Sequence, residues 1–326
     1  MANSRVTIKD VAREASVTPQ TVSRAFRECK DISDQTRQRI LQIADRMGYV
    51  RNNFATSLRS GASHQIAVVY DNLMNCYFSI MTELIQNSLK ERGYTMLAIS
   101  VKDTHLTETA YQTALGHNVD GIISFLEPNA NISSLIDKYN VPVLLFGRRT
   151  DKSNIAYIHT DDIMIGLLAS KKLLESGCKN PLFITESLEL TCAYDRYQGF
   201  REPFLEQGIE PILYENELGK ELRAEKCLLK LYEENNFPDG IFCFNDMLAF
   251  EVLYVIEKYS LPQCKVIGVD DIQSEIFFPR RLTSVGVDKK LMTHQCVEMM
   301  IEIIQSGKRA IKTVTQPVFL VQGSTA

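Results

Sequence analysis

Residues 7–26 read TIKDVAREASVTPQTVSRAF, and this stretch contains two helix starts in close succession. Thr7 is a suitable N-cap residue, and Asp10 occupies the capping-box position. Thr18 offers a second N-cap, and Pro19 follows it at N1, where the fixed φ of proline favours a helix. The stretch therefore predicts two short helices joined by a tight turn.

The next segment predicts a third helix, which begins at Ser33 and ends near Gly48, a residue that can take the left-handed conformation. Two short helices and a third that closes their core are typical of a helix-turn-helix. In that motif the second helix, here residues 19–26, lies in the major groove of DNA. A three-helix domain that makes only protein contacts has the same spacing, so periodicity alone leaves both interpretations open.

Charge is distributed unevenly along the chain. Residues 1–61 hold 11 Lys and Arg against 6 Asp and Glu, whereas residues 62–326 hold 25 against 34. The net charge of the whole chain, -4, hides this difference. The pattern predicts a small module attracted to a polyanion and a larger acidic module that is not.

Length and composition exclude several classes of protein. The chain has 326 residues, of which 45% are hydrophobic and 23% charged, which indicates about two globular domains. Its apolar runs fall short of the ~20 residues of a membrane helix, and its first ten residues are polar, so we expect neither a membrane span nor export. The eight cysteines form no CxxC pair, so we expect reduced thiols.

From Gln65 onward, short β-rich runs alternate with helix-length amphipathic stretches, a pattern typical of parallel sheets covered on both faces. Because the succession occurs once before about residue 160 and again after Pro181, we predict an α/β fold of two doubly wound lobes with a ligand cleft between them. The predicted strands are 66–70, 96–100, 121–124, 143–146, 182–185, 240–244 and 266–269, and the predicted helices are 78–92, 163–176, 197–207, 222–234 and 248–259.

An enzyme is one alternative to a ligand-binding protein as the interpretation of this chain. The chain contains no GxGxxG, GxxxxGK[ST], GxSxG or HExxH motif. Its five histidines have no partner at metal-ligand spacing. We therefore expect no catalytic residue, no metal ion and no cofactor.

Polar side chains follow several of the predicted strands. Asp71, Asn245, Asp246 and Asp270 each follow an apolar run, and Arg196 opens a helical stretch. Asp and Asn in such places are often only helix caps or turn formers. As a set at equivalent strand ends they predict a site for a polyhydroxylated ligand, because carboxylates and amides bind hydroxyls and an arginine fixes one end.

Two adjacent arginines, Arg148 and Arg149, follow the predicted strand at 143–146. Such a pair can add a contact to a phosphate or carboxylate group of a ligand. A pair of solvated charges at a strand end is the interpretation that we favour.

The segments TIKDVA at 7–12, SVT at 16–18, TVSR at 21–24 and Gly48-Tyr49 stand in a fixed order. This combination closely resembles the N-terminal signature of the LacI/GalR (lactose-repressor) family of bacterial transcription regulators. The resemblance implies base contacts from Gln20 and Arg24, which suit adenine and guanine, and only an apolar contact from Pro19. The implied DNA-contacting residues of this module are Thr7, Thr18, Pro19, Gln20, Thr21, Ser23 and Arg24.

The stretch 50–61, VRNNFATSLRSG, reads by itself as a linker. The resemblance implies instead a hinge helix that orders on operator DNA, with Asn52 at its start and Leu58 wedged into the minor groove. Arg51 and Thr56 depart from the family, which usually has Pro and commonly Arg at these two places.

The resemblance continues through DRYQGF at 195–200, FNDMLA at 244–249 and GVDD at 268–271. It implies a periplasmic-binding-protein-like effector domain, and the segment 282–285 resembles the crossover back to the first lobe. The segment 71–78 lacks the family's frequent Asn-Pro-Phe-Phe, although two aromatic side chains there can form a wall. With the addition of Asp71 and Arg148, which follow predicted strands, the expected effector-binding residues are Asp71, Tyr77, Phe78, Arg148, Arg196, Asn245, Asp246 and Asp270.

The resemblance implies a ligand-responsive regulator, a repressor of carbohydrate-utilisation genes, that acts in the cytoplasm on nucleoid DNA. We expect double-stranded operator DNA, a second copy in a homodimer and a small sugar-like effector as its partners. The expected domains are the helix-turn-helix at 1–50, the hinge at 51–61 and the bilobal effector and dimerisation domain at 62–326. A solute-binding protein of a transport system shares the bilobal fold, but the missing signal peptide and the basic module argue against it. A sugar-processing enzyme fused to a helix-turn-helix has no motif in its favour.

Overall fold

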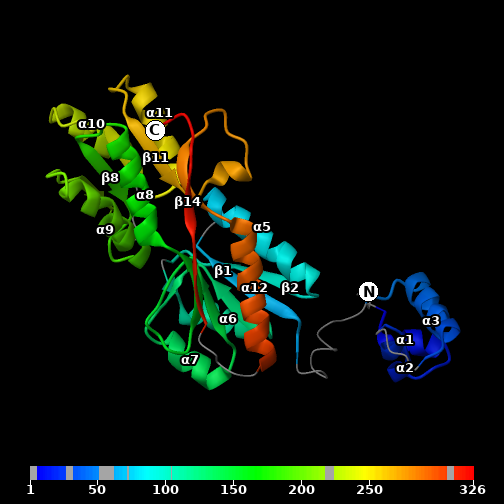
Figure 1. Cartoon of the computed structure of the whole chain (residues 1–326). Coiled ribbons are helices and arrows are strands. Elements are labelled where there is room, and N and C mark those ends of the chain that lie inside the picture. Colours follow the sequence, from blue (N-terminus) through cyan, green and yellow to red (C-terminus); the bar gives the residue numbers. More distant parts are fainter. Residues whose placement is uncertain are drawn as a thin grey trace. The chain divides into compact units, whose positions relative to one another are not determined.

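The computed structural model describes residues 6–26, 32–50, 62–71, 73–103, 105–216, 224–306 and 312–326 (Figure 1). The chain divides into two compact units, Met1–Ser63 and His64–Ala326. The hinge expected at 51–61 lies outside the described residues.

The first unit contains three helices, α1 (Ile8–Glu14), α2 (Pro19–Ala25) and α3 (Asp34–Arg46). Thr7 caps α1, and its backbone N–H and its hydroxyl donate to the Asp10 carboxylate at 3.0 and 2.6 Å. The Thr18 hydroxyl accepts from the backbone N–H of Thr21 at 3.2 Å, with Pro19 at N1 of α2. These caps confirm the predicted helix starts, since each satisfies backbone donors that the first turn leaves free.

Small and β-branched side chains form the core of this unit, where one apolar face of each helix meets the other two. Val11, Val22 and Ile40 are completely buried and come from α1, α2 and α3 in turn. Arginines of α3 tie the other helix ends: Arg37 donates to the Ala25 carbonyl at 3.2 Å, and Arg39 donates to the Ala15 carbonyl at 3.1 Å. Cations at helix C-termini satisfy the last carbonyls and complement the helix dipole.

The second unit contains two six-stranded sheets, which define two lobes. In spatial order the first-lobe sheet is β13 (Thr313–Gln316), β7 (Ala156–Thr160), β6 (Val143–Phe146), β4 (Gly121–Ser124), β1 (Gln65–Tyr70) and β2 (Thr95–Ser100). The second-lobe sheet is β14 (Val318–Val321), β12 (Thr283–Val287), β11 (Lys265–Val269), β10 (Gly240–Cys243), β8 (Pro181–Thr185) and β9 (Ile212–Glu215). All neighbouring strands pair in parallel except β12 and β14.

Helices lie on both faces of each sheet. The first lobe holds α5 (Cys76–Glu91), α6 (Glu108–Gly116), α7 (Ile132–Tyr139) and α12 (Lys289–Ser306), with a small sheet of β3 (His105–Leu106) and β5 (Glu127–Pro128). The second lobe holds α8 (Asp162–Glu175), α9 (Thr191–Leu205), α10 (Ala224–Glu233), α11 (Asp246–Lys258) and the 3-10 turn η1 (Ile272–Ser274). This arrangement confirms the predicted pair of doubly wound lobes.

The chain passes between the lobes three times: from β7 to α8, from β12 to α12, and from β13 to β14 (Figure 1). The segment expected as the crossover, residues 282–285, belongs mostly to β12 of the second sheet, and the chain crosses only after Val287. Each lobe is therefore built from discontinuous segments, and three neighbouring connections join the two lobes.

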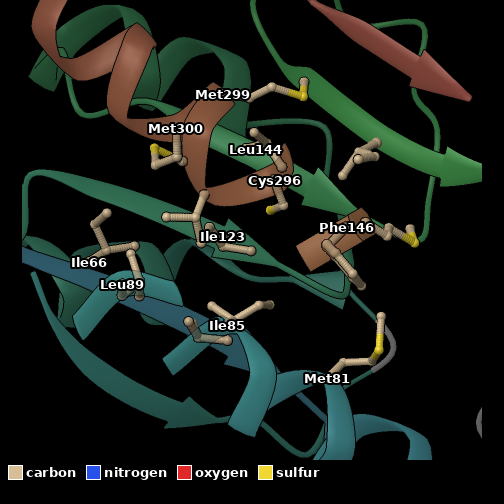
Figure 2. Close-up of a cluster of buried hydrophobic side chains, with 14 of the residues drawn as sticks. Ile66, Met81, Ile85, Leu89, Ile123, Leu144, Phe146, Cys296, Met299 and Met300 are labelled. Atoms are coloured by element: carbon tan, nitrogen blue, oxygen red, sulfur yellow. The ribbon is translucent and has the colours of Figure 1, made fainter. Parts of the chain in front are cut away.

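The core of the first lobe has two layers, because the buried strands direct alternate residues to opposite faces. Ala67 and Val69 of β1 pack on the side of α6 and α7, whereas Ile66 and Val68 pack against α5 and α12. Figure 2 shows the second of these layers, in which the labelled side chains are Ile66, Met81, Ile85, Leu89, Ile123, Leu144, Phe146, Cys296, Met299 and Met300. The packing of these side chains between sheet and helices holds the carboxyl ends of the first-lobe strands in place.

In the second lobe, α8 and α9 pack backbone to backbone. Gly166 of α8 lies against the Arg196 carbonyl, and Gly199 of α9 lies against the Ile163 carbonyl, with no room for a Cβ at either glycine. Beneath them, the rings of Phe183 and Phe242 stack with centroids 4.7 Å apart. This close approach brings the α9 arginine within reach of the start of α8.

The described residues hold seven free cysteines. None of the described helices combines the length and apolarity needed to cross a bilayer. Within the described ranges, no cluster of three or more His, Cys, Asp or Glu side chains is suited to a metal ion.

Candidate functional site

A cavity lies between the two lobes, at the carboxyl ends of both sheets, and it measures about 660 Å³ when the part open to solvent is counted. Ligands of parallel α/β folds bind at this edge, where the strands end and helices begin. The lining residues are Asn75, Tyr77, Phe78, Phe125, Phe146, Gly147, Arg148, Thr160, Ile165, Arg196, Phe244, Asn245, Val269, Asp270, Val285, Gly286, Val287 and Val318.

Arg196 is a buried cation that the protein itself holds in place. Its Nε donates to Asp162 Oδ1 at 2.9 Å, and its Nη1 donates to the Phe244 carbonyl at 2.6 Å. The guanidinium carbon lies 4.8 Å from the centroid of the Phe244 ring, a cation–π contact. Burial opposes the charge of Arg196, but Asp162 and further anions outweigh it, so the pKa of Arg196 is raised and the guanidinium stays charged.

Asp270 lies at the end of β11 with a φ of 101°, a strained conformation for a residue other than glycine. Its backbone N–H donates to the Val285 carbonyl at 3.0 Å, which fixes the turn. Burial raises the pKa of its carboxyl to about 7, although Arg196 and Lys289 act in the opposite direction. The cavity therefore contains an acid that can donate or accept a hydrogen bond near neutral pH.

Two asparagines cap the helices whose first turns face the cavity. Asn245 Oδ1 accepts from the Leu248 N–H at 2.9 Å at the start of α11, and Asn75 Oδ1 accepts from the Tyr77 N–H at 3.0 Å at the start of α5. Their caps use only the amide oxygens. The amide N–H₂ groups are thus available as hydrogen-bond donors, one from each lobe.

The first unit carries a second candidate surface, the outer face of α2. Thr18, Pro19, Gln20 and Arg24 are exposed there, while Val22 on the opposite face is completely buried. The helix thus presents its polar N-terminal end to solvent on a rigid three-helix frame, as major-groove reading requires.

Comparison with known proteins gives the family. The family description "Bacterial regulatory proteins, lacI family" matches residues 7–52, and "Periplasmic binding protein-like domain" matches residues 171–326. The HTH-type transcriptional regulator DegA of Bacillus subtilis is 30% identical over 300 residues, which cover 88% of each chain. The chain belongs to the LacI family. This LacI-family protein is a DNA-binding transcriptional regulator and not an enzyme.

Other relatives and solved structures agree with this assignment. The sucrose operon repressor of Streptococcus mutans is 27% identical over 324 residues, 98% of each chain, and the transcriptional repressor PurR of Erwinia tasmaniensis is 25% identical over 318 residues, 94% of this chain and 93% of its own. The Lac repressor dimer bound to operator and the anti-inducer ONPF has a TM-score of 0.84 at 22% identity, over 99% of each chain. The CelR–cellobiose complex has a TM-score of 0.68 at 20% identity, over 99% of this chain and 100% of its own. These structures share the fold of the LacI-family chain.

Six of the eight expected effector-binding residues line the cavity: Tyr77, Phe78, Arg148, Arg196, Asn245 and Asp270. Asp246 does not line it and is completely buried; it accepts from the Ser284 hydroxyl at 2.7 Å and from the Ile272 N–H at 2.9 Å. Asp246 therefore links Ser284 of β12 to Ile272, which follows β11. The expectation that Asp246 forms part of the cavity wall is wrong. Asp71 is also absent from the lining, and its carbonyl accepts from the Ser100 hydroxyl at 2.8 Å.

The prediction of a solvated pair fails for Arg148, which is partly buried, whereas the Arg149 side chain is 46% exposed. Arg148 lines the cavity and donates to the Sγ of Cys192 on α9. Arg149 forms an ion pair with Asp195 on the same helix, with 2.6 Å between nitrogen and oxygen. Both partners belong to the other lobe, so the two arginines bridge the lobes.

Sequence reasoning misses most of the apolar wall and two polar residues, Asn75 and Thr160. Phe125, Phe146 and Phe244 lie at or just after strand ends, where a phenylalanine reads as an ordinary core residue. Asn75 is missed because it does not directly follow a strand as Asn245 nearly does, and its N-cap position at the start of α5 is the signal that could have found it. Of the expected DNA-contacting residues, Thr7 is exposed and Thr21 and Ser23 are partly buried, while Asn52 and Leu58 lie outside the described residues.

Proposed function

We propose that this protein represses transcription by binding a pseudo-palindromic operator as a homodimer, and that a small sugar-like effector in the interlobe cavity controls this binding. The observation that carries the proposal is a cavity lined by aromatic and polar side chains from both lobes, in a chain that also exposes the polar face of a helix-turn-helix. The effector domain thus has a place for a ligand, and the DNA-binding unit has a surface for bases.

Several observations support the DNA side of the proposal. Gln20 and Arg24 are exposed on α2 and are chemically suited to read adenine and guanine in the major groove. One such helix contacts few bases, so useful selectivity needs two half-sites and a two-fold protein. The relatives named above include repressors, and the Lac repressor in the similar structure is a dimer on its operator.

The effector side rests on the three connections between the lobes and on the polar groups that face each other across the cavity. A ligand held by Arg196, Asn245 and Asp270 from the second lobe and by Tyr77 from the first favours the closed arrangement of the lobes. A change of lobe angle in a dimer changes the spacing of the two segments at 51–61, where we place the hinge helices with Asn52 and Leu58. Coupling of this kind is typically ~1–3 kcal/mol, which tunes operator affinity up to about a hundredfold.

The proposal includes the expected domain boundaries, residues 1–50, 51–61 and 62–326, and action in the cytoplasm on nucleoid DNA. It is supported by the relatives' names as transcriptional regulators. The similar structures with D-xylulofuranose, ribose and cellobiose support a sugar-like effector.

The test is an anisotropy titration of a labelled duplex from the upstream region of the protein's own gene, with and without a panel of sugars and sugar derivatives. We expect at least one compound to change operator affinity in the wild type. Asp270→Asn should keep operator binding and lose that response. A normal response in Asp270→Asn and also in Asn245→Ala would exclude the cavity as the effector site.

A further inference from the structure

The cavity holds two arginines with different surroundings. Arg196 has a carboxylate partner, Asp162, at 2.9 Å. Arg148 donates instead to the Sγ of Cys192, and burial raises the pKa of this thiol, so Cys192 is neutral at physiological pH. Among the described residues, no carboxylate lies within ion-pair distance of the Arg148 guanidinium. Its charge therefore has no partner of opposite sign in that part of the chain.

Burial opposes the charge of Arg148, but Glu127 and Asp162 act on it from beyond ion-pair distance and help to raise its pKa. Glu127 accepts a hydrogen bond from the Thr191 hydroxyl at 3.2 Å, and Asp162 accepts from Arg196. The adjacent Arg149 offers an internal comparison, because it has Asp195 as its partner at 2.6 Å. The Arg148 guanidinium therefore stays charged, and because no carboxylate among the described residues pairs with it directly, an anionic ligand can form that ion pair.

The remaining polar groups of the cavity also favour a negatively charged ligand. Asn75 and Asn245 present amide donors at the first turns of α5 and α11, where the helix dipoles place partial positive charge. Asp270 is the one carboxylate among the described lining residues, and burial holds its pKa at about 7. The lining therefore offers two cations and several donors against a single acid that is partly neutral at physiological pH.

We propose that the effector is an anionic sugar derivative whose carboxylate or phosphate group is bound by Arg148, while its hydroxyls contact Asn245 and Asp270. This inference rests on the proposed function, because it assigns a ligand class to the same cavity. The aromatic wall of Phe78, Phe125 and Phe146 lies beside this polar end and suits the apolar C–H faces of a sugar ring. Arg148 and Phe146 come from the first lobe and Arg196 and Asp270 from the second, so an anionic sugar spans both.

The test compares neutral sugars with their acids and phosphate esters on the full-length protein. The probes are glucose, gluconate and glucose 6-phosphate; ribose, ribonate and ribose 5-phosphate; fructose and fructose 6-phosphate; and inorganic phosphate alone. Binding is measured by calorimetry and by the thermal shift. We expect an acid or an ester to bind at least tenfold more tightly than its neutral parent, and the better of the two identifies the group as carboxylate or phosphate.

Three variants make the assignment specific. Arg148→Met should weaken binding of the anionic compound at least tenfold and that of the neutral parent less than threefold. Arg148→Lys should recover part of the loss, because it restores the charge without the planar fork. Arg149→Met is the matched control: it removes a neighbouring arginine that has its own partner, and it should leave the preference for anions unchanged.

The melting temperature of the ligand-free variants tests whether Arg148 is merely structural. Arg148→Met should lower this temperature less than Arg196→Met does, because Arg196 loses an ion pair and Arg148 has none among the described residues; an equal or larger fall would overturn the proposal. Neutral sugars that bind as tightly as the anions and still change operator affinity would overturn it too, while the proposed function would stand. If operator binding occurs but no probe changes it, both the proposal and the effector part of the proposed function are contradicted.

Discussion

Replacing Arg196 by methionine should destabilise the second unit through the carboxylate that it leaves behind. Arg196 is 8% exposed and Asp162 is 6% exposed, so their ion pair is shielded from water. Without the arginine, the Asp162 carboxylate keeps a long hydrogen bond from the Thr160 hydroxyl, at 3.4 Å, which does not neutralise its charge. Removing one member of a buried pair costs ~3–5 kcal/mol, which for a domain of this size lowers the melting temperature by about 6–20 °C.

The double variant Arg196→Met/Asp162→Asn separates this cost from a general packing defect. It also removes the Asp162 charge that Arg196→Met leaves unpaired, so it should be more stable than Arg196→Met alone. Apolar or neutral replacements of a whole buried ion pair are often well tolerated. Arg201→Met provides the control on the same helix. Arg201 pairs with Glu210 at 2.6 Å, but both side chains are more than a third exposed, so Arg201→Met should lower the melting temperature far less than Arg196→Met.

The sign of the pH dependence follows from Asp162. Burial already raises the pKa of this carboxyl above 3.8 even with Arg196 opposing the shift, and loss of the arginine raises it further. A group with a raised native pKa destabilises the native state increasingly as pH rises through that range. The deficit of Arg196→Met should therefore be smaller at pH 5 than at pH 8, as measured by thermal unfolding followed by circular dichroism. An Arg196→Met variant within about 1 kcal/mol of the wild type at pH 8, or a double variant that is no more stable than Arg196→Met, would refute the reasoning.

Three further predictions concern other parts of the molecule. Gly199→Ala should lower the melting temperature more than Gly116→Ala, because a Cβ at Gly199 overlaps the Ile163 carbonyl whereas Gly116 of α6 has open space; equal effects would contradict the backbone packing of α8 on α9. Asp270→Asn should become more stable relative to the wild type as pH rises from 4 to 7, by up to ~4 kcal/mol, because in this range the wild-type carboxyl ionises in the unfolded chain but stays protonated in the native one; a flat difference in unfolding free energy would contradict this. Arg24→Ala should weaken specific DNA binding by ~1–3 kcal/mol and non-specific binding less, and Arg13→Ala on α1 is its charge-matched control in the same anisotropy titration.

The elements that the sequence predicts correctly are those with local signals. Thr7, Thr18 and Ser33 cap the three helices of the first unit, and their roles depend only on residues within the next turn. The predicted strands at 121–124 and 143–146 match β4 and β6 because a buried parallel strand is a continuous apolar run.

The elements that the sequence does not reveal depend on contacts between distant segments. β13 at Thr313–Gln316 pairs with β7 at Ala156–Thr160, and neither is apolar throughout, so neither stands out as a strand. Helix α9 begins at Thr191 rather than at 197, and its first turn carries no capping side chain that could signal the start.

The candidate site is predictable where topology alone brings residues together. Carboxyl ends of parallel strands meet at one edge, which is why the sequence is sufficient to place Asn245 and Asp270 at the cavity. The prediction for Arg148 fails, and that for Arg149 misses its ion pair, because their partners, Cys192 and Asp195, lie 44 and 46 residues away in the other lobe. The prediction for Asp246 fails because its partners Ser284 and Ile272 become neighbours only when β11 and β12 pair.

The measurement that tests the central claim most directly is selection of bound duplexes from a random library by the full-length protein, followed by the stoichiometry on the selected site. We expect an inverted repeat bound by two chains, with each half-site read by one α2 helix. Leu58→Ala should bind the same repeat with less bending of the duplex. Recovery of no preferred sequence, or of a single unrepeated site bound by one chain, would contradict the account.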